Sequence, residues 1–244
     1  MFRSDGMKKL AEKGRFSWQE FSEVFQSGST PLSEATMRKH LQEMLKRGVI
    51  VRVGRNAYCV PSQPLSLYQH DYSELAQQAA QTLQEQYPLV AFTVLELIQL
   101  NAFLNHQLAH NALFLSVEED AMDFVFDAMK TAYPGKVLCD PTPELYHQYW
   151  YDGMIVLKRL VTEAPHDPQV PWHTRLEKLL VDLLCEKILM ESISESEYPT
   201  ILETAFANYV VDESSLFRYA RRRGADKRLK RLIREQTNIT LRTE

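Results

Sequence analysis

Two histidines, His106 and His110, are spaced so that one helix face could present both to a metal ion. In the metalloprotease pattern with this spacing, a glutamate follows the first histidine and acts as general base. Gln107 occupies that position, and no third ligand stands out nearby. We therefore interpret both histidines as residues of a helix surface or core, and we expect no bound metal.

A second pattern is that of a nuclease, in which two acids and a lysine surround a metal ion. Asp140 follows a predicted strand at 136–139, and Lys158 lies in a later one at 154–161. An acid two residues before the lysine would complete the site, but Val156 stands there. We interpret Asp140 as a strand-end or turn residue beside Pro141.

The motifs of several other enzyme classes do not occur in the sequence. It contains no GxGxxG, GK[ST] or GxSxG, and neither Cys59 nor Cys185 has a histidine placed to activate it. We therefore expect a protein without catalytic residues and without a cofactor.

Charge is unevenly distributed along the 244 residues, although the net charge is only -4. Residues 1–62 hold 11 Lys/Arg and 6 Asp/Glu, residues 63–214 hold 7 and 23, and residues 215–244 hold 10 and 3. The corresponding net charges are +5, -16 and +7. Blocks of opposite sign indicate parts with different partners.

The N-terminal segment predicts three short helices followed by a hairpin. Helices are expected at 7–13 and 18–26, the second with Ser17 and Glu20 as a capping box. A third begins after Ser33 as N-cap and ends at Gly48. Its apolar face is formed by Met37, Leu41, Met44 and Leu45.

The stretch KRGVIVRVGRNAYCVP, residues 46–61, then gives two apolar β runs around a basic turn. This order of elements is typical of a winged helix-turn-helix, whose last helix enters the DNA major groove and whose hairpin, the wing, contacts phosphates or the minor groove. Arg and Lys can pair with guanine and Gln with adenine. The predicted DNA contacts are Ser33, Thr36, Arg38, Lys39, Gln42 and Lys46 on the helix, and Arg52, Arg55 and Asn56 on the hairpin. Winged helices also serve as protein-docking modules, and that alternative stays open.

The remainder, after a linker between Pro61 and Pro64, predicts an α/β domain. A helix at 72–86 comes first, followed by strands at 89–93, 112–116, 136–139 and 154–161 that alternate with helices at 94–108, 117–132 and 143–150. From Trp172 onward the pattern is helical, at 175–190, 195–207, 213–223 and 226–235. The predicted architecture is a winged helix over 1–62 and a larger α/β domain over 63–244 with a central, mixed sheet.

The last helices carry the most basic stretch of the chain. A second contact with nucleic acid or with an acidic partner could involve Arg218, Arg221, Arg222, Arg223, Lys227, Arg228 and Arg231. The equally weighted alternative is a solvated amphipathic helix that packs through Leu229, Leu232 and Ile233.

The sequence also indicates the cellular compartment of the protein. Three cysteines lie far apart without a CxxC pair, which is typical of reduced thiols in a cytoplasm. The most apolar segment, 89–100, contains Glu96 and is too short to span a bilayer, and the N-terminus lacks the apolar stretch of a signal peptide. We expect a cytoplasmic protein without a membrane partner.

Three stretches resemble AbiEi-type antitoxins of type IV toxin–antitoxin systems: LKRGVIVRVGRNAYCV, TRLEKLLVDLLCEK and LFRYARRRG. The resemblance implies a prokaryotic protein that binds its own promoter through the N-terminal domain and counters a nucleotidyltransferase-like toxin. Where the family's hairpin tip usually reads Arg-Gly-Val-Tyr, this chain has Arg55-Asn56-Ala57-Tyr58. Asparagine tolerates positive φ, so we expect a left-handed backbone at Asn56.

The leading hypothesis is therefore a non-enzymatic, autoregulating antitoxin whose partners are double-stranded promoter DNA and the toxin. The alternatives are a nucleic-acid enzyme, nuclease or nucleotidyltransferase-like, that its winged helix delivers to DNA, and a protein-interaction module.

Overall fold

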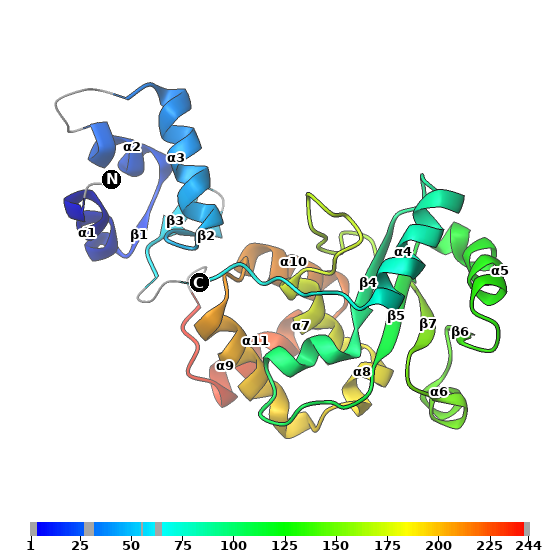
Figure 1. Ribbon diagram of the computed structural model, residues 1–244. Helices are drawn as coiled ribbons and strands as arrows, with labels where there is room; N and C mark the ends of the chain where they lie inside the picture. The colour runs from blue at the N-terminus through cyan, green and yellow to red at the C-terminus, as the bar shows by residue number, and fades with distance from the viewer. Residues whose placement is uncertain (1–3, 27–31, 55, 62–64, 242–244) are drawn as a thin grey trace. The chain divides into compact units, whose positions relative to one another are not determined.

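The computed structural model describes residues 4–26, 32–54, 56–61 and 65–241 (Figure 1). In this part of the chain the fold is mixed α/β and contains two sheets. The chain forms two compact units: a first unit of residues 1–68, 203–215 and 239–244, and a second unit of residues 69–202 and 216–238. A functional division at residue 62 stays a prediction.

The first unit begins with helices and strands that follow the predicted order. They are α1 (Ser4–Lys13), β1 (Arg15–Phe16), α2 (Trp18–Gln26), α3 (Glu34–Lys46), β2 (Val51–Gly54) and β3 (Ala57–Cys59). The strands form an antiparallel sheet in the order β1-β3-β2, so the hairpin also pairs with the short strand between α1 and α2.

The predicted helix caps are confirmed. The backbone N–H of Ser17 donates to Glu20 Oε2 at 2.8 Å, and the N–H of Glu20 donates to Ser17 Oγ at 3.3 Å. The Ser33 hydroxyl accepts from the N–H of Thr36 at 3.2 Å. Each cap satisfies backbone donors that the first turn of a helix leaves without a partner. The start of α2 and of α3 is thus determined locally.

The hairpin buries its inner side against two segments that the sequence pattern did not connect with it. Val51, Val53, Ala57 and Cys59 form a core cluster with Leu65, and Val210 packs against it. The second segment is held by backbone hydrogen bonds: Ser66 donates to Asn208 O at 3.1 Å, and Val210 donates to Ser66 O at 2.9 Å. The first unit is therefore built from distant parts of the chain.

The second unit contains a four-stranded sheet in the order β4-β5-β7-β6. Its strands are β4 (Phe92–Glu96), β5 (Ala112–Val117), β6 (Val137–Cys139) and β7 (Met154–Arg159). β5, β7 and β6 are parallel, and β4 is antiparallel to β5, so the predicted mixed sheet is confirmed. The predicted helix at 94–108 is wrong at its start, because 94–96 belong to β4 and only a 3-10 helix, η1 (Leu97–Ala102), follows.

Helices cover both faces of this sheet (Figure 1). α4 (Glu74–Gln86) and α5 (Met122–Ala132), the latter preceded by η2 (Glu119–Ala121), pack on Val94, Leu113, Leu115, Ile155 and Leu157. On the other face lie α6 (Pro143–Tyr149), α7 (Leu176–Cys185), α8 (Lys187–Glu191) and α10 (Glu213–Arg222). The remaining elements are η3 (Glu195–Glu197), α9 (Tyr198–Asn208) and α11 (Asp226–Gln236).

The helix predicted over 175–190 is interrupted at one residue. Glu186 has extended backbone (φ -88°, ψ 112°), which ends α7 and starts α8. Its carboxylate reaches Lys158 Nζ at 3.0 Å, a contact that periodicity along the helix cannot reveal. The break therefore points the Glu186 side chain toward the sheet.

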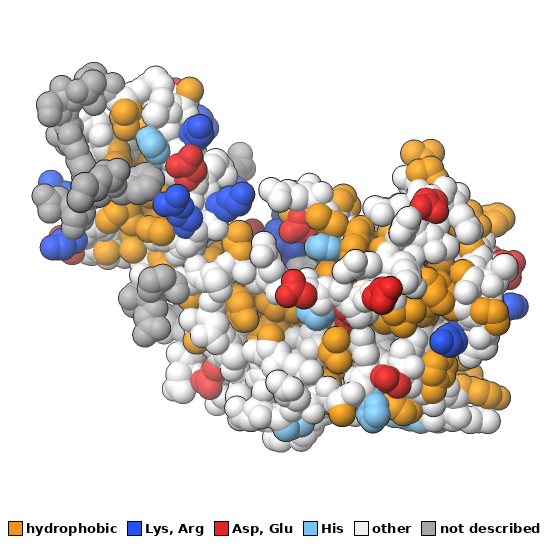
Figure 2. All heavy atoms as spheres, viewed as in Figure 1, with side chains coloured by type: hydrophobic (Ala, Val, Ile, Leu, Met, Phe, Trp, Pro, Cys, Tyr) orange, Lys and Arg blue, Asp and Glu red, His pale blue; other side chains and the backbone are white. Residues whose placement is uncertain are grey.

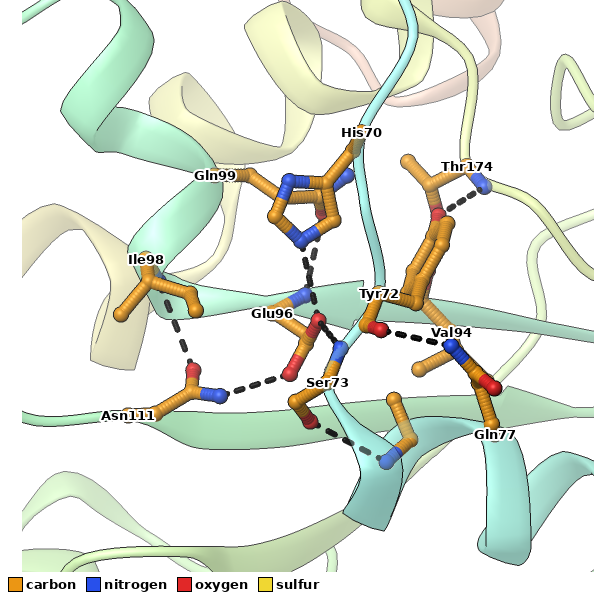
Figure 3. A network of polar contacts seen from close by, with 11 residues as sticks. His70, Tyr72, Ser73, Gln77, Val94, Glu96, Ile98, Gln99, Asn111 and Thr174 are labelled. Carbon is orange, nitrogen blue, oxygen red and sulfur yellow. Dashed lines mark hydrogen bonds and ion pairs between the residues drawn. The ribbon is translucent and has the colours of Figure 1, made fainter.

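A buried carboxylate, Glu96 at the end of β4, fixes three separate segments (Figure 3). It accepts from His70 Nε2 at 2.9 Å, from the N–H of Ser73 at 2.9 Å and from Asn111 Nδ2 at 2.6 Å. Burial by itself would raise the pKa of Glu96, but the hydrogen bonds from these three residues outweigh it and lower the pKa below its usual value. Glu96 is thus held as a carboxylate at neutral pH.

Beside it, Tyr72 joins β4 to the segment that leads into α7 (Figure 3). Its hydroxyl donates to Val94 O at 3.0 Å and accepts from the N–H of Thr174 at 2.9 Å. Burial raises the pKa of Tyr72 to about 12, so the phenol remains a donor at all physiological pH values.

We predict that Gly48→Ala destabilises the protein far more than Gly14→Ala. Both glycines end helices with positive φ, +65° and +69°, where an alanine costs about 1–2 kcal/mol. A Cβ at Gly48 would also collide with the carbonyl oxygen of Leu65, whereas one at Gly14 would have no described atom within 4 Å apart from its chain neighbours. Urea unfolding should show a loss of about 3 kcal/mol or more for Gly48→Ala. Equal losses would contradict the close approach of residue 65.

We also predict that Glu96→Gln lowers stability in a pH-dependent way. Because the folded pKa lies below the unfolded one, the carboxylate stabilises the fold above about pH 4.3 and loses this effect as the pH falls through the folded value. Unfolding should show a loss of about 2 kcal/mol at pH 7 that shrinks only as the pH falls below about 4.3. Glu85→Gln, an exposed carboxylate on α4, should show neither effect. A loss that does not vary with pH would contradict the interpretation.

Candidate nucleic-acid interface

One side of α3 is exposed and polar, while the other is buried. Met37, Leu41 and Met44 lie in the core at 4% exposure or less. The exposed residues include Ser33, Arg38, Lys39, Gln42 and Lys46, and Thr36 is half-buried. With 3.6 residues per turn, Lys39, Gln42 and Lys46 form one stripe along the helix. Figure 2 shows Lys and Arg side chains gathered over α3.

Arg38 is held in place by two neighbours. Its Nε and Nη2 donate to Glu34 Oε1 at 3.0 and 2.7 Å, one helical turn earlier. The guanidinium carbon also lies 4.9 Å from the centroid of the Trp18 ring, which is cation–π geometry. These contacts hold the guanidinium at the first turns of α3.

The hairpin turn has the backbone that the sequence predicts. Asn56 has φ +52°, in the left-handed region, which confirms the expectation. Its Oδ1 accepts from the N–H of Trp18 at 3.1 Å, so the turn is bonded to the start of α2. Arg52 is exposed on β2, opposite Tyr58 of β3. Arg55, also predicted to contact DNA, lies outside the described residues.

Trp18 was not among the predicted site residues, although it connects two of them. Its backbone binds Asn56 and its ring lies under Arg38, while the ring also stacks on Phe21 at a centroid distance of 5.8 Å. The available signal in the sequence was an aromatic residue at the start of the capped helix that precedes the predicted basic helix. Trp18 thus links the hairpin turn to the exposed face of α3.

The basic residues of the C-terminal helices divide into two groups. Arg218, Arg221, Arg222, Lys227 and Arg231 are exposed, and Arg222 Nε donates to Thr162 Oγ1 at 2.7 Å.

The other two, Arg223 and Arg228, point into their own unit. Arg228 donates to Leu184 O and to Glu195 Oε1, each at 3.2 Å. Arg223 lies 3.7 Å from carboxylate oxygens of Asp182 and Glu186. Internal contacts therefore account for these two residues, whereas the first group places its charge at the surface.

The structure brings the residues of the incomplete nuclease pattern together, but not the two histidines of the metalloprotease pattern. Asp140 and Lys158 come together at 2.6 Å, with Glu186 on the other side of the lysine, while Val156 is fully buried. Among the described residues no three His, Cys, Asp or Glu side chains are grouped so as to hold a metal ion.

The histidine pair does not lie on one helix, because η1 ends at Ala102. His106 Nδ1 lies 3.2 Å from Glu197, and His110 Nδ1 lies 3.9 Å from Asp152. The expected helix position of both residues is therefore wrong, and each histidine faces its own acidic partner.

We predict that the Asn56 side chain stabilises the hairpin turn in two separable ways. Asn56→Gly keeps the left-handed backbone but removes the acceptor, which should cost about 1 kcal/mol. Asn56→Ala removes the acceptor and adds backbone strain, for a total of about 2 kcal/mol or more. Amide hydrogen exchange at Trp18 should accelerate in both variants and stay slow in Asn56→Asp, which keeps the acceptor. Slow exchange in Asn56→Gly would contradict the bond to Trp18.

Comparison with known proteins gives a family but no activity. No curated protein matches the chain. No helix in the described part of the chain is both long and apolar enough to cross a membrane. Residues 36–239 match a family of unknown function, DUF6577, and this range includes most of α3, the hairpin and all of the second unit. Since the match covers most of the 244 residues, the chain belongs to the DUF6577 family.

Proposed function

We propose that this protein is a DNA-binding transcriptional regulator of antitoxin type, with residues 1–62 as a winged helix-turn-helix. The observation that carries the proposal is the exposed stripe of Lys39, Gln42 and Lys46 on α3, directly followed by the β2–β3 hairpin. The connectivity α1-β1-α2-α3-β2-β3 and the sheet order β1-β3-β2 support the same interpretation.

In this proposal α3 lies in the major groove with its N-terminal turns toward the bases. Arg38 reads a guanine edge, because Glu34 and Trp18 already hold its guanidinium in position. Lys39 and Lys46 contact phosphates, Gln42 reads adenine, and Ser33 and Thr36 approach the backbone at the start of the helix. Arg52 and Asn56 of the hairpin lie at the adjacent minor groove.

The antitoxin role rests on the resemblance to AbiEi-type proteins. This resemblance implies that the remainder of the chain neutralises a nucleotidyltransferase-like toxin in a prokaryotic cytoplasm. The stretch TRLEKLLVDLLCEK falls largely in α7, where Leu176 to Leu184 are all buried. Residues of this stretch therefore support the fold, and a surface that acts on the toxin has to lie elsewhere.

We predict that the full-length protein shifts a DNA probe from its own upstream region with a steep dependence on salt. Contacts with about four phosphates would give a log–log slope near -3.6. The double variant Arg38→Ala/Lys39→Ala should lose specific binding while its melting temperature is retained, because both residues are exposed.

The matched control is Lys136→Ala/Lys187→Ala, which removes the same charge from exposed positions that are not among the predicted nucleic-acid contacts. It should bind the specific probe as the wild type does. Unchanged affinity in the α3 variant would overturn the role of this helix, and equal losses in both variants would indicate non-specific attraction. A salt-insensitive complex with the toxin, without any DNA shift, would instead favour a protein-docking module.

A further inference from the structure

The second unit contains a polar recess at the carboxyl ends of its parallel strands. Phe114 and Ser116 of β5 and Lys158 of β7 point to the same face of the sheet, opposite to the face covered by α4 and α5. α7, α8, α10 and the turn directly after α10 close the recess from the other side with Lys178, Asp182, Glu186, Leu189, Tyr219 and Arg223. In open α/β sheets, ligands bind at this end of the strands.

The carboxylates of the recess are already occupied. Asp182 accepts from Lys178 Nζ at 2.6 Å through one oxygen, and from the Tyr219 hydroxyl at 2.9 Å through the other. Glu186 accepts from Lys158 Nζ at 3.0 Å, and Asp140 holds the same ammonium from the outer side at 2.6 Å. Burial by itself would lower the pKa of Lys158, but these two carboxylates raise it above its usual value. The lysine is thus fixed and charged.

The hydrogen-bond donors, in contrast, exceed these acceptors. The ammonium of Lys178 has three N–H groups and is 4% exposed, while Asp182 takes one of them. The guanidinium of Arg223 approaches Asp182 and Glu186 only to 3.7 Å, which is beyond hydrogen-bond distance, and its hydrogen bond to the Cys185 side chain takes one of its five N–H groups. The hydroxyl of Ser116 lines the same recess. Because Lys178 and Arg223 keep further N–H groups beyond these contacts, the arrangement favours a ligand that supplies acceptor oxygens.

We propose that this recess binds the phosphate group of a small phosphate monoester. The donors come from three different segments, Lys158 on β7, Lys178 on α7 and Arg223 in the turn directly after α10, so they approach the recess from different sides. A tetrahedral anion can present an oxygen to each of these directions, and charge-assisted bonds to phosphate are among the strongest that Lys and Arg form. The site is separate from α3 and the hairpin, and it does not depend on DNA binding.

The test is isothermal titration calorimetry of the full-length protein at constant ionic strength. The probes are inorganic phosphate and AMP, with adenosine as the phosphate-free control. Phosphate and AMP should bind and adenosine should not. Arg223→Gln should weaken binding of both phosphate probes about tenfold or more, because it removes a charged donor. Arg221→Gln carries the same change on an exposed position of α10 and should bind as the wild type does.

A second variant, Ser116→Ala, keeps every charge of the recess. It tests the same site if Arg223→Gln fails to fold. It should weaken phosphate binding about threefold. In amide NMR spectra of the wild type, phosphate should shift the signals of Ser116, Lys158 and Arg223. The proposal is overturned if about 10 mM phosphate produces neither heat nor these shifts, since that concentration would detect a millimolar site. Equal weakening in Arg221→Gln and Arg223→Gln, or unchanged binding in Ser116→Ala and Arg223→Gln, would overturn it as well.

Discussion

A charged side chain that is buried away from water needs an oppositely charged neighbour, and this requirement determines the contacts in the interior of the second unit. α7 is buried along nearly its whole length, so its polar side chains cannot reach solvent. Lys178 and Asp182, one turn apart, therefore pair with each other. The hydroxyl of Tyr219 on α10 donates to the second oxygen of the Asp182 carboxylate. Loss of one partner would leave an uncompensated buried charge, which couples the packing of α7 to that of α10.

Elements that local chemistry defines could be predicted from the sequence. The caps at Ser17 and Ser33 use hydrogen bonds within one turn, and the left-handed turn at Asn56 depends on a property of asparagine itself. Three strands of the second unit, β5, β6 and β7, were predicted to within two residues because each is a short apolar run bounded by turn residues, whereas the strand predicted at 89–93 lies at Phe92–Glu96. The exposed face of α3 follows from helical periodicity in the same way.

Features that depend on tertiary contacts could not be predicted. The run from Phe92 to Glu96 fits a strand or a helix equally well by periodicity, and its burial within the sheet decides for the strand. The break at Glu186 is explained by contacts with Lys158 and Arg223, which are distant in sequence. The same holds for the place of Trp18 between Asn56 and Arg38, since only the folded backbone brings these residues together.

The packing of Val210 beneath the hairpin has a consequence for the order of synthesis. A ribosome completes the hairpin and Leu65 early, but Val210, which also packs against the apolar side of the hairpin, is made about 150 residues after β3. The core cluster that contains Leu10, Phe16 and Leu41 can pack from residues that are made early, whereas the contact of Val210 with the hairpin forms late in translation. A chain that stops before residue 210 lacks this contact.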